Sequence, residues 1–240
     1  MYKKLFNKNN LNSDKGFTLL EVIVVVAIFG IMTAVIIFNY SNFNSKVILT
    51  NMAYEIALTT RQAQVFGLGA RSGDTTVLDL APNVQFESPF GMYFDLRDGT
   101  GPKANTTDQF IMFVDEVNKQ IVDGGEITVS DHFCKNGPTK TCTCSSDVTD
   151  ECVNKFQMQR GMYISDLRVF NTSSSCTPTR AVAISFKRPN PDGIIVDQER
   201  GTATTYRSLQ ITVTSKNGDN EYVIMRENGQ LAVQSNPICS

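Results

Sequence analysis

Glu21 is the only charged residue in an otherwise apolar stretch that runs from Phe17 to Phe38. A charged side chain costs about 2.5 to 3.5 kcal/mol at the centre of a membrane helix and less near its end. Two interpretations fit this position. The carboxylate is either tolerated in the first helical turn, where the helix dipole favours negative charge, or it pairs with a cation supplied by another chain.

The second group of reactive side chains is a set of cysteines, all of which follow the apolar stretch. They are Cys134, Cys142, Cys144, Cys152, Cys176 and Cys239. An even count in an exported segment indicates disulfides, and six cysteines allow fifteen pairings. Zinc binding is the alternative role for these cysteines, but the spacings between them do not match paired C-x-x-C ligands. We expect disulfides to staple a Cys-rich insertion at residues 131–176, with Cys142 and Cys144 taking separate partners.

Acidic residues in one loop raise the question of a metal. Asp115, Asn118 and Asp123 are candidates for calcium, although their spacing is not that of an EF-hand and acids next to glycine are typical of a solvated hairpin loop. His132 is the only histidine, and no nucleophile motif lies near it, so we expect a surface loop residue. The sequence therefore predicts no enzyme, no cofactor and no metal site beyond these calcium candidates.

The element that carries Glu21 is a predicted transmembrane helix at residues 17–38. Its 22 residues would span roughly the 30 Å of a bilayer core. The preceding residues 1–16 hold four lysines, which indicates a cytoplasmic N-terminus and an exported C-terminal part. No A-x-A pattern follows the helix, so we do not expect release by a signal peptidase.

The stretch "KGFTLLEVIVVVAIFGIMTAVII" resembles the N-terminal signature of type IV pilins and type II secretion pseudopilins. The resemblance covers about residues 14–38. It implies that residues 1–16 are a leader peptide, that a prepilin peptidase cuts after Gly16, and that Phe17 becomes the methylated mature terminus. It further implies that Glu21 pairs with the terminal amine of a neighbouring subunit's Phe17 during assembly.

The helix is expected to continue as an amphipathic segment through residues 39–68. One helical face carries Leu49, Met52, Ala53, Ile56, Thr60 and Ala63. We expect this face to pack on a sheet, and Gly67 and Gly69 to end the helix. The segment "EIALTTRQAQVFGLGARSG" also resembles the region that follows the membrane helix in the H-type minor pseudopilin and its minor pilin relatives.

Residues 69–240 are expected to form a β-rich head. Strands are expected at residues 75–80, 91–96, 109–114, 126–130, 161–170, 181–186, 193–196, 208–215, 221–226 and 230–234. Two Asn-Gly pairs indicate a closing antiparallel meander. The expected fold class is α+β, with one long helix packed on antiparallel sheet as in pilins.

The favoured function is a structural, minor pilin or pseudopilin subunit, with a DNA-binding or adhesive tip subunit as the alternative. The resemblance implies a prepilin peptidase, other pilin or pseudopilin subunits and an inner-membrane assembly platform as partners. Membrane lipid would surround the helix before the subunit enters a pilus or pseudopilus. Residues 39–240 hold 18 basic against 22 acidic residues, a balance of −4, which does not favour nucleic acid. The basic residues considered for DNA are Arg61, Arg71, Arg180, Lys187 and Arg188.

Overall fold

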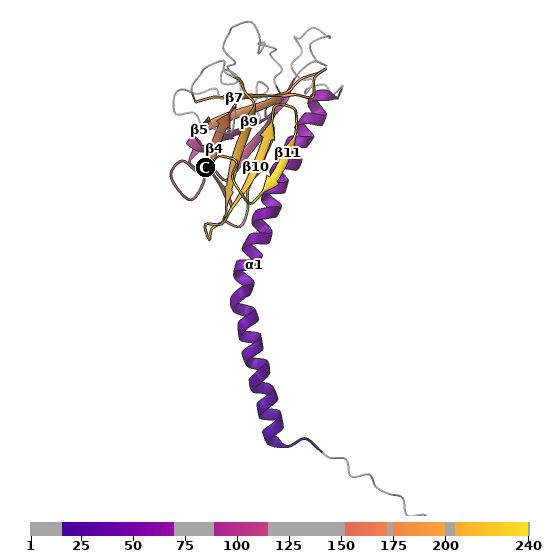
Figure 1. The fold of residues 1–240 in the computed structure, drawn as a ribbon, viewed down its shortest axis with the longest axis vertical. Coiled ribbons are helices and arrows are strands. Elements are labelled where there is room, and N and C mark those ends of the chain that lie inside the picture. The colour runs from indigo at the N-terminus through magenta and orange to yellow at the C-terminus, as the bar shows by residue number, and fades with distance from the viewer. Residues whose placement is uncertain (1–15, 70–88, 115–151, 172–174, 200–204, 240) are drawn as a thin grey trace, which may run out of the picture. The chain divides into compact units, whose positions relative to one another are not determined.

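The computed structural model describes residues 16–69, 89–114, 152–171, 175–199 and 205–239 (Figure 1). The elements in chain order are α1 (Leu19–Leu68), β1 (Phe90–Asp95), the 3-10 helix η1 (Leu96–Asp98), β2 (Gln109–Val114), β3 (Cys152–Gln157), β4 (Tyr163–Phe170), β5 (Cys176–Thr179), β6 (Ala181–Phe186), β7 (Gly193–Asp197), β8 (Thr205–Tyr206), β9 (Ser208–Thr214), β10 (Asn220–Arg226) and β11 (Leu231–Gln234). The strands expected at residues 75–80 and 126–130 lie outside the described residues.

The chain divides into two compact units, residues 1–43 and residues 44–240. Helix α1 contributes to both units. In the first unit, the segment Leu19–Ile37 has a mean hydropathy of 2.8 and none of its residues is buried. Its length and composition are sufficient to cross a membrane.

The described strands of the second unit form two antiparallel sheets. Sheet A has the strand order β3-β2-β1-β6-β7-β8, and sheet B has the order β11-β10-β9-β4-β5. The C-terminal part of α1 is drawn beside β11 in Figure 1. The α+β prediction, with a helix packed on antiparallel sheet, is confirmed.

One hydrophobic core joins α1 to both sheets. The predicted helical face is confirmed, because Leu49, Ala53, Ile56 and Ala63 are at most 2% exposed and contribute to this core. Alternate residues of sheet A and of sheet B complete it: Met92, Phe94, Ile184, Phe186, Leu209, Ile211, Val213, Val223 and Met225. Thr60 is accommodated in the apolar face because its hydroxyl donates to the Ile56 carbonyl at 2.8 Å.

The end of α1 differs in part from the expectation. The helix ends at Leu68, and the Gly69 N–H donates to the Val65 carbonyl oxygen at 2.8 Å. Gly67 lies within the helix and does not terminate it. A Cβ atom at Gly67 would stand 2.3 Å from the Phe186 carbonyl oxygen, so this glycine permits close contact between α1 and β6.

Both predicted Asn-Gly turns are present in the closing meander β9-β10-β11. The backbone φ angle is 89° at Gly218 and 76° at Gly229. Each glycine N–H donates at 2.9 Å to the carbonyl three residues earlier, Ser215 and Arg226 respectively. This is the three-residue hairpin loop in which glycine takes the left-handed position, so the prediction of the meander is confirmed.

Candidate processing and assembly site

The first turn of α1 is organised by a threonine cap. The Glu21 backbone N–H donates to the Thr18 hydroxyl oxygen at 3.2 Å, and the Val22 N–H donates to the Thr18 carbonyl oxygen at 3.2 Å. Thr18 therefore acts as the N-cap, and Glu21 occupies the third helical position, which is the Thr-x-x-Glu spacing of a capping box. The helix consequently begins two residues after Phe17.

The peptide bond between Gly16 and Phe17 lies just before this cap. The Phe17 side chain is 82% exposed, and no atom lies within 4 Å of the position that a Cβ on Gly16 would occupy. An enzyme therefore meets no obstruction from the described residues at this bond. The small Gly16 also leaves the backbone on the leader side accessible to a cleft that would exclude a larger side chain.

Glu21 is exposed and sits in the first turn of the helix. Within the described residues, its carboxylate takes part in no hydrogen bond or ion pair. The helix dipole gives it partial compensation. The group is consequently available to a cation from another molecule.

Apolar side chains surround this carboxylate. From Leu19 to Ile37 the large hydrophobic residues are about half to four-fifths exposed, from 47% for Val24 to 79% for Leu19. An apolar surface of this extent requires lipid or another protein to cover it.

The geometry agrees with what the comparisons find. The family described as the prokaryotic N-terminal methylation motif matches residues 11–37. The chain carries the type IV pilin and pseudopilin signature. No solved structure matches the chain. The motif supports a pilin-like or pseudopilin subunit, a structural protein, and implies processing by prepilin peptidase and assembly with other pilin subunits. Together with the apolar helix, it fits membrane anchoring before assembly.

This pilin-like chain has a second exposed apolar surface, which the sequence reasoning missed. Val47, Tyr54, Leu58 and Val65 are 42%, 52%, 68% and 58% exposed. Their spacing of 7, 4 and 7 residues places them on one side of α1, opposite to the buried face. The same spacing is readable in the sequence, but only burial of the other face distinguishes this stripe from core. We call these four residues the outer stripe.

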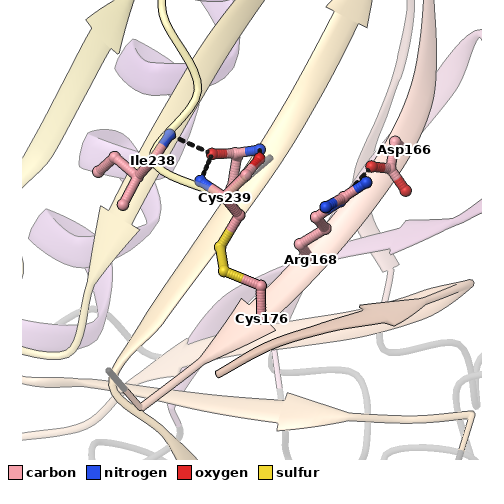
Figure 2. Close-up of a disulfide and its surroundings, with 6 residues drawn as sticks. Asp166, Arg168, Cys176, Ile238 and Cys239 are labelled. Carbon is pink, nitrogen blue, oxygen red and sulfur yellow. Dashed lines mark hydrogen bonds and ion pairs between the residues drawn. A yellow bond between two sulfur atoms is a disulfide. The ribbon is translucent and has the colours of Figure 1, made fainter. Parts of the chain in front are cut away.

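The cysteines of the head form disulfides where the structure describes them. Cys176 is bonded to Cys239 with a Cα–Cα distance of 5.8 Å and a sequence separation of 63 (Figure 2). Cys152 is also disulfide-bonded. Cys134, Cys142 and Cys144, which include its remaining candidate partners, lie outside the described residues.

The bonded tail is also held by one buried side chain. The Gln210 side-chain oxygen accepts hydrogen bonds from the backbone N–H groups of Ile238 and Cys239 at 2.8 and 3.0 Å. Its amide nitrogen donates to the Cys239 carbonyl oxygen at 3.1 Å. Gln210 is 1% exposed, so these three bonds satisfy a buried amide and fix the chain end against β9. No motif or spacing in the sequence marks this clamp.

The calcium candidates Asp115, Asn118 and Asp123 lie outside the described residues, as does His132. Among the residues that are described, no group of three or more His, Cys, Asp or Glu side chains could hold a metal ion.

The basic residues considered for DNA are partly engaged within the head. Arg180 forms an ion pair with Glu199 at 2.6 Å, and Arg61 donates to the Gln64 side-chain oxygen. Arg71 lies outside the described residues. The ion pair compensates the positive charge of Arg180, whereas the hydrogen bond to the neutral Gln64 only occupies one donor of Arg61.

A polar cluster on sheet A combines Tyr93, Asp95 and Arg97. The Asp95 carboxylate is 6% exposed and accepts from the Tyr93 hydroxyl and from Nε and Nη2 of Arg97, each at 2.8 Å. Burial, reinforced by the charge of Asp95, raises the pKa of the Tyr93 hydroxyl well above its ordinary value. The hydrogen bond to Asp95 raises the pKa of Arg97. Both groups therefore keep their protons, and the cluster serves as a structural anchor for η1.

Proposed function

We propose that this chain is a prepilin of a type IV pilus or a type II secretion pseudopilus that is cut between Gly16 and Phe17. Water would add across that peptide bond and leave a carboxylate on Gly16 and an amine on Phe17. A methyl group would then pass from a methylsulfonium donor to the Phe17 nitrogen, which would lose one proton while the donor leaves as a thioether. The observation that carries the proposal is the methylation motif at residues 11–37 joined to an accessible bond directly before the capped helix.

The proposed assembly contact is an ion pair between Glu21 of one subunit and the Phe17 amine of its neighbour. A methylated amine still binds a proton near neutral pH and stays cationic. Either charge alone would be costly among apolar side chains, whereas the pair compensates both. The absence of a partner for Glu21 within the described residues supports this role.

Helix α1 would hold the subunit in the bacterial inner membrane before assembly. The lysine-rich residues 1–16 would stay cytoplasmic and the head would face outward. The outer stripe would then face a neighbouring subunit, since it needs an apolar cover that its own head does not provide. An assembly platform in the inner membrane would receive the processed chain.

A minor subunit fits this head better than a densely packed major one. A head of about 170 residues with a Cys-rich insertion offers more surface than close packing requires. The internal ion pair of Arg180 with Glu199 and the negative charge of residues 39–240 do not favour a DNA-binding tip.

Processing is tested by the intact mass of the full chain expressed with and without a prepilin peptidase. We expect the loss of residues 1–16 and the gain of one methyl group on Phe17, both abolished by Gly16→Val. Gly30→Ala is the control, since a Cβ there meets no atom within 4 Å. An intact leader in the presence of an active peptidase would contradict the proposal.

Assembly is tested separately by recovery of sheared filaments. Glu21→Ala should reduce incorporation into filaments while cleavage continues. Glu55→Ala provides the matched control, because Glu55 is an exposed glutamate on the same helix outside the apolar segment. Equal incorporation of both variants would contradict the proposed ion pair and leave the processing proposal intact.

A further inference from the structure

A pocket of about 340 Å³ is lined by residues at the end of β4, the start of β9 and the end of β10 in sheet B. Phe170, Ser208 and Arg226 are neighbours across β4, β9 and β10, because Ser208 pairs in register with both of the others. The residues that follow or precede them in the strands, such as Leu209, belong to the core. Side chains alternate along a strand, so these three point away from the core.

The pocket is hollow because Ser208 is short while its neighbours are long. Ser208 is 8% exposed and forms the floor. Phe170 and Ile238 supply apolar surface, and Arg226 supplies a guanidinium. The remaining lining residues are Asn171, Arg207, Glu227 and Asn228.

The charges of the pocket do not cancel. Arg207 Nε lies 3.7 Å from Glu227 Oε1, so these two groups compensate each other. The guanidinium of Arg226 makes no hydrogen bond or ion pair among the described residues. Counting only the residues that the structure describes, the pocket holds one uncompensated positive charge beside an apolar surface.

The apolar wall at Ile238 is fixed in place. Its N–H donates to Gln210, and the next residue is joined to Cys176 by the disulfide (Figure 2). The wall is therefore already ordered before a ligand binds, so binding does not bear the entropic cost of ordering it.

We propose that this pocket binds a single carboxylate attached to a small apolar group. A guanidinium and a carboxylate form paired, charge-assisted hydrogen bonds, and Phe170 and Ile238 would cover the apolar part. The volume lies at the lower end of the range for ligand pockets, which suits a group of amino-acid size. Glu227 at the rim and the net negative charge of residues 39–240 disfavour a polyanion.

The test uses the full chain in detergent micelles and ligand-observed NMR with three probes. N-acetyl-leucine carries a chain-end carboxylate, N-acetyl-aspartyl-leucinamide carries a side-chain carboxylate, and N-acetyl-leucinamide is neutral. We expect at least one of the acids to bind and the neutral amide to bind at least tenfold more weakly. The acid that binds more tightly identifies the source of the carboxylate. Equal binding of all three probes, or binding of none, would overturn the proposal.

Substitutions locate the binding. Arg226→Gln should weaken binding of the acids about tenfold or more. Arg168→Gln should change it less than twofold, because Arg168 is paired with Asp166 and does not line the pocket. Retained binding in Arg226→Gln would refute the assignment of the guanidinium.

Two further variants test the shape of the pocket. Ser208→Val should fill the floor and abolish binding of the acids. Ile238→Ala tests the wall independently if Ser208→Val fails to fold, and it should weaken N-acetyl-leucine more than inorganic phosphate. Phosphate that displaces the acids at equal concentration would show recognition of charge alone and would refute the apolar part of the proposal. Filament assembly is not involved in any of these measurements, so the outcome is independent of the proposed function.

Discussion

Removing the bond between Cys176 and Cys239 should destabilise the head by an amount that depends on Gln210. The disulfide closes a loop at a sequence separation of 63. The chain-entropy relation gives about 4 kcal/mol for a loop of this size, as an upper value. Gln210→Leu removes three hydrogen bonds and leaves buried backbone groups of the tail unpaired, so we expect a loss of about 2 to 4 kcal/mol.

The two perturbations should not add. Both interactions hold the same tail, so once the disulfide is gone the tail detaches more easily and Gln210 has fewer partners to lose. In a double-mutant cycle of Cys176→Ala/Cys239→Ala with Gln210→Leu, we expect the combined loss to fall short of the sum by about 1 kcal/mol or more.

The assay is denaturant unfolding of the full chain in a non-ionic detergent, followed by near-ultraviolet circular dichroism. Substitution is preferable to a reductant because Cys152 is also disulfide-bonded and a reductant would break both. Gln62→Leu, on the exposed side of α1, is the control for the loss of a glutamine. Additivity within about 0.5 kcal/mol would refute the view that the clamp and the disulfide act on one tail.

Three other perturbations test individual contacts by the same unfolding measurement. Gly67→Ala should cost about 1 to 3 kcal/mol because its Cβ would meet the Phe186 carbonyl oxygen at 2.3 Å, whereas Gly30→Ala should cost nothing. Helix propensity alone would make Gly67→Ala more stable. A measured increase in the free energy of unfolding would therefore contradict the contact with Phe186. Asp95→Ala should lower the free energy of unfolding by about 2 to 4 kcal/mol. This is below the range for fully buried ion pairs because the arginine partner is 36% exposed. A loss below about 1 kcal/mol would refute the role of the cluster as a structural anchor. Burial raises the pKa of Asp98, so the free energy of unfolding should increase as the pH falls through that raised pKa towards 3.8. Asp98→Asn should remove this increase. A variant whose pH profile matches that of the unchanged chain would contradict the burial effect.

Local periodicity was enough to predict most of the described fold. The expected strands at residues 109–114 and 181–186 have the observed bounds because continuous apolar runs there are buried in sheet A. The α1 core face was readable from spacing alone. The Asn-Gly turns were readable because the left-handed conformation requires specific residues.

The strands that were missed are those whose sequences lack an apolar run. β3 is mostly exposed, β5 contains Pro178, and β8 has two residues. All three lie at sheet edges, where each pairs with one neighbouring strand. They form because they pair with that neighbour, and their own residues have little tendency to form a strand. Gly67 was assigned to a helix end because its contact with β6 depends on tertiary packing.

The functional residues also differ in how far the sequence alone could predict them. Gly16, Phe17 and Glu21 were identified from a contiguous motif, whose meaning lies in the sequence order itself. The Gln210 clamp and the pocket around Ser208 join residues from separate strands and the chain end. Neither a spacing nor a composition marks them, because their proximity is created by the sheet register.

The disulfide between Cys176 and Cys239 has a mechanical consequence. Of the strands that the structure describes, it encloses the seven from β5 to β11 in one covalent ring. A pull applied between α1 and any point inside that ring enters it at Cys176 and is shared by two arms of the chain. Even if every hydrogen bond in the ring were broken, the roughly 200 Å of extended chain within it could not be stretched into a single straight segment. A head on a filament under tension would thus lengthen less than its residue count suggests.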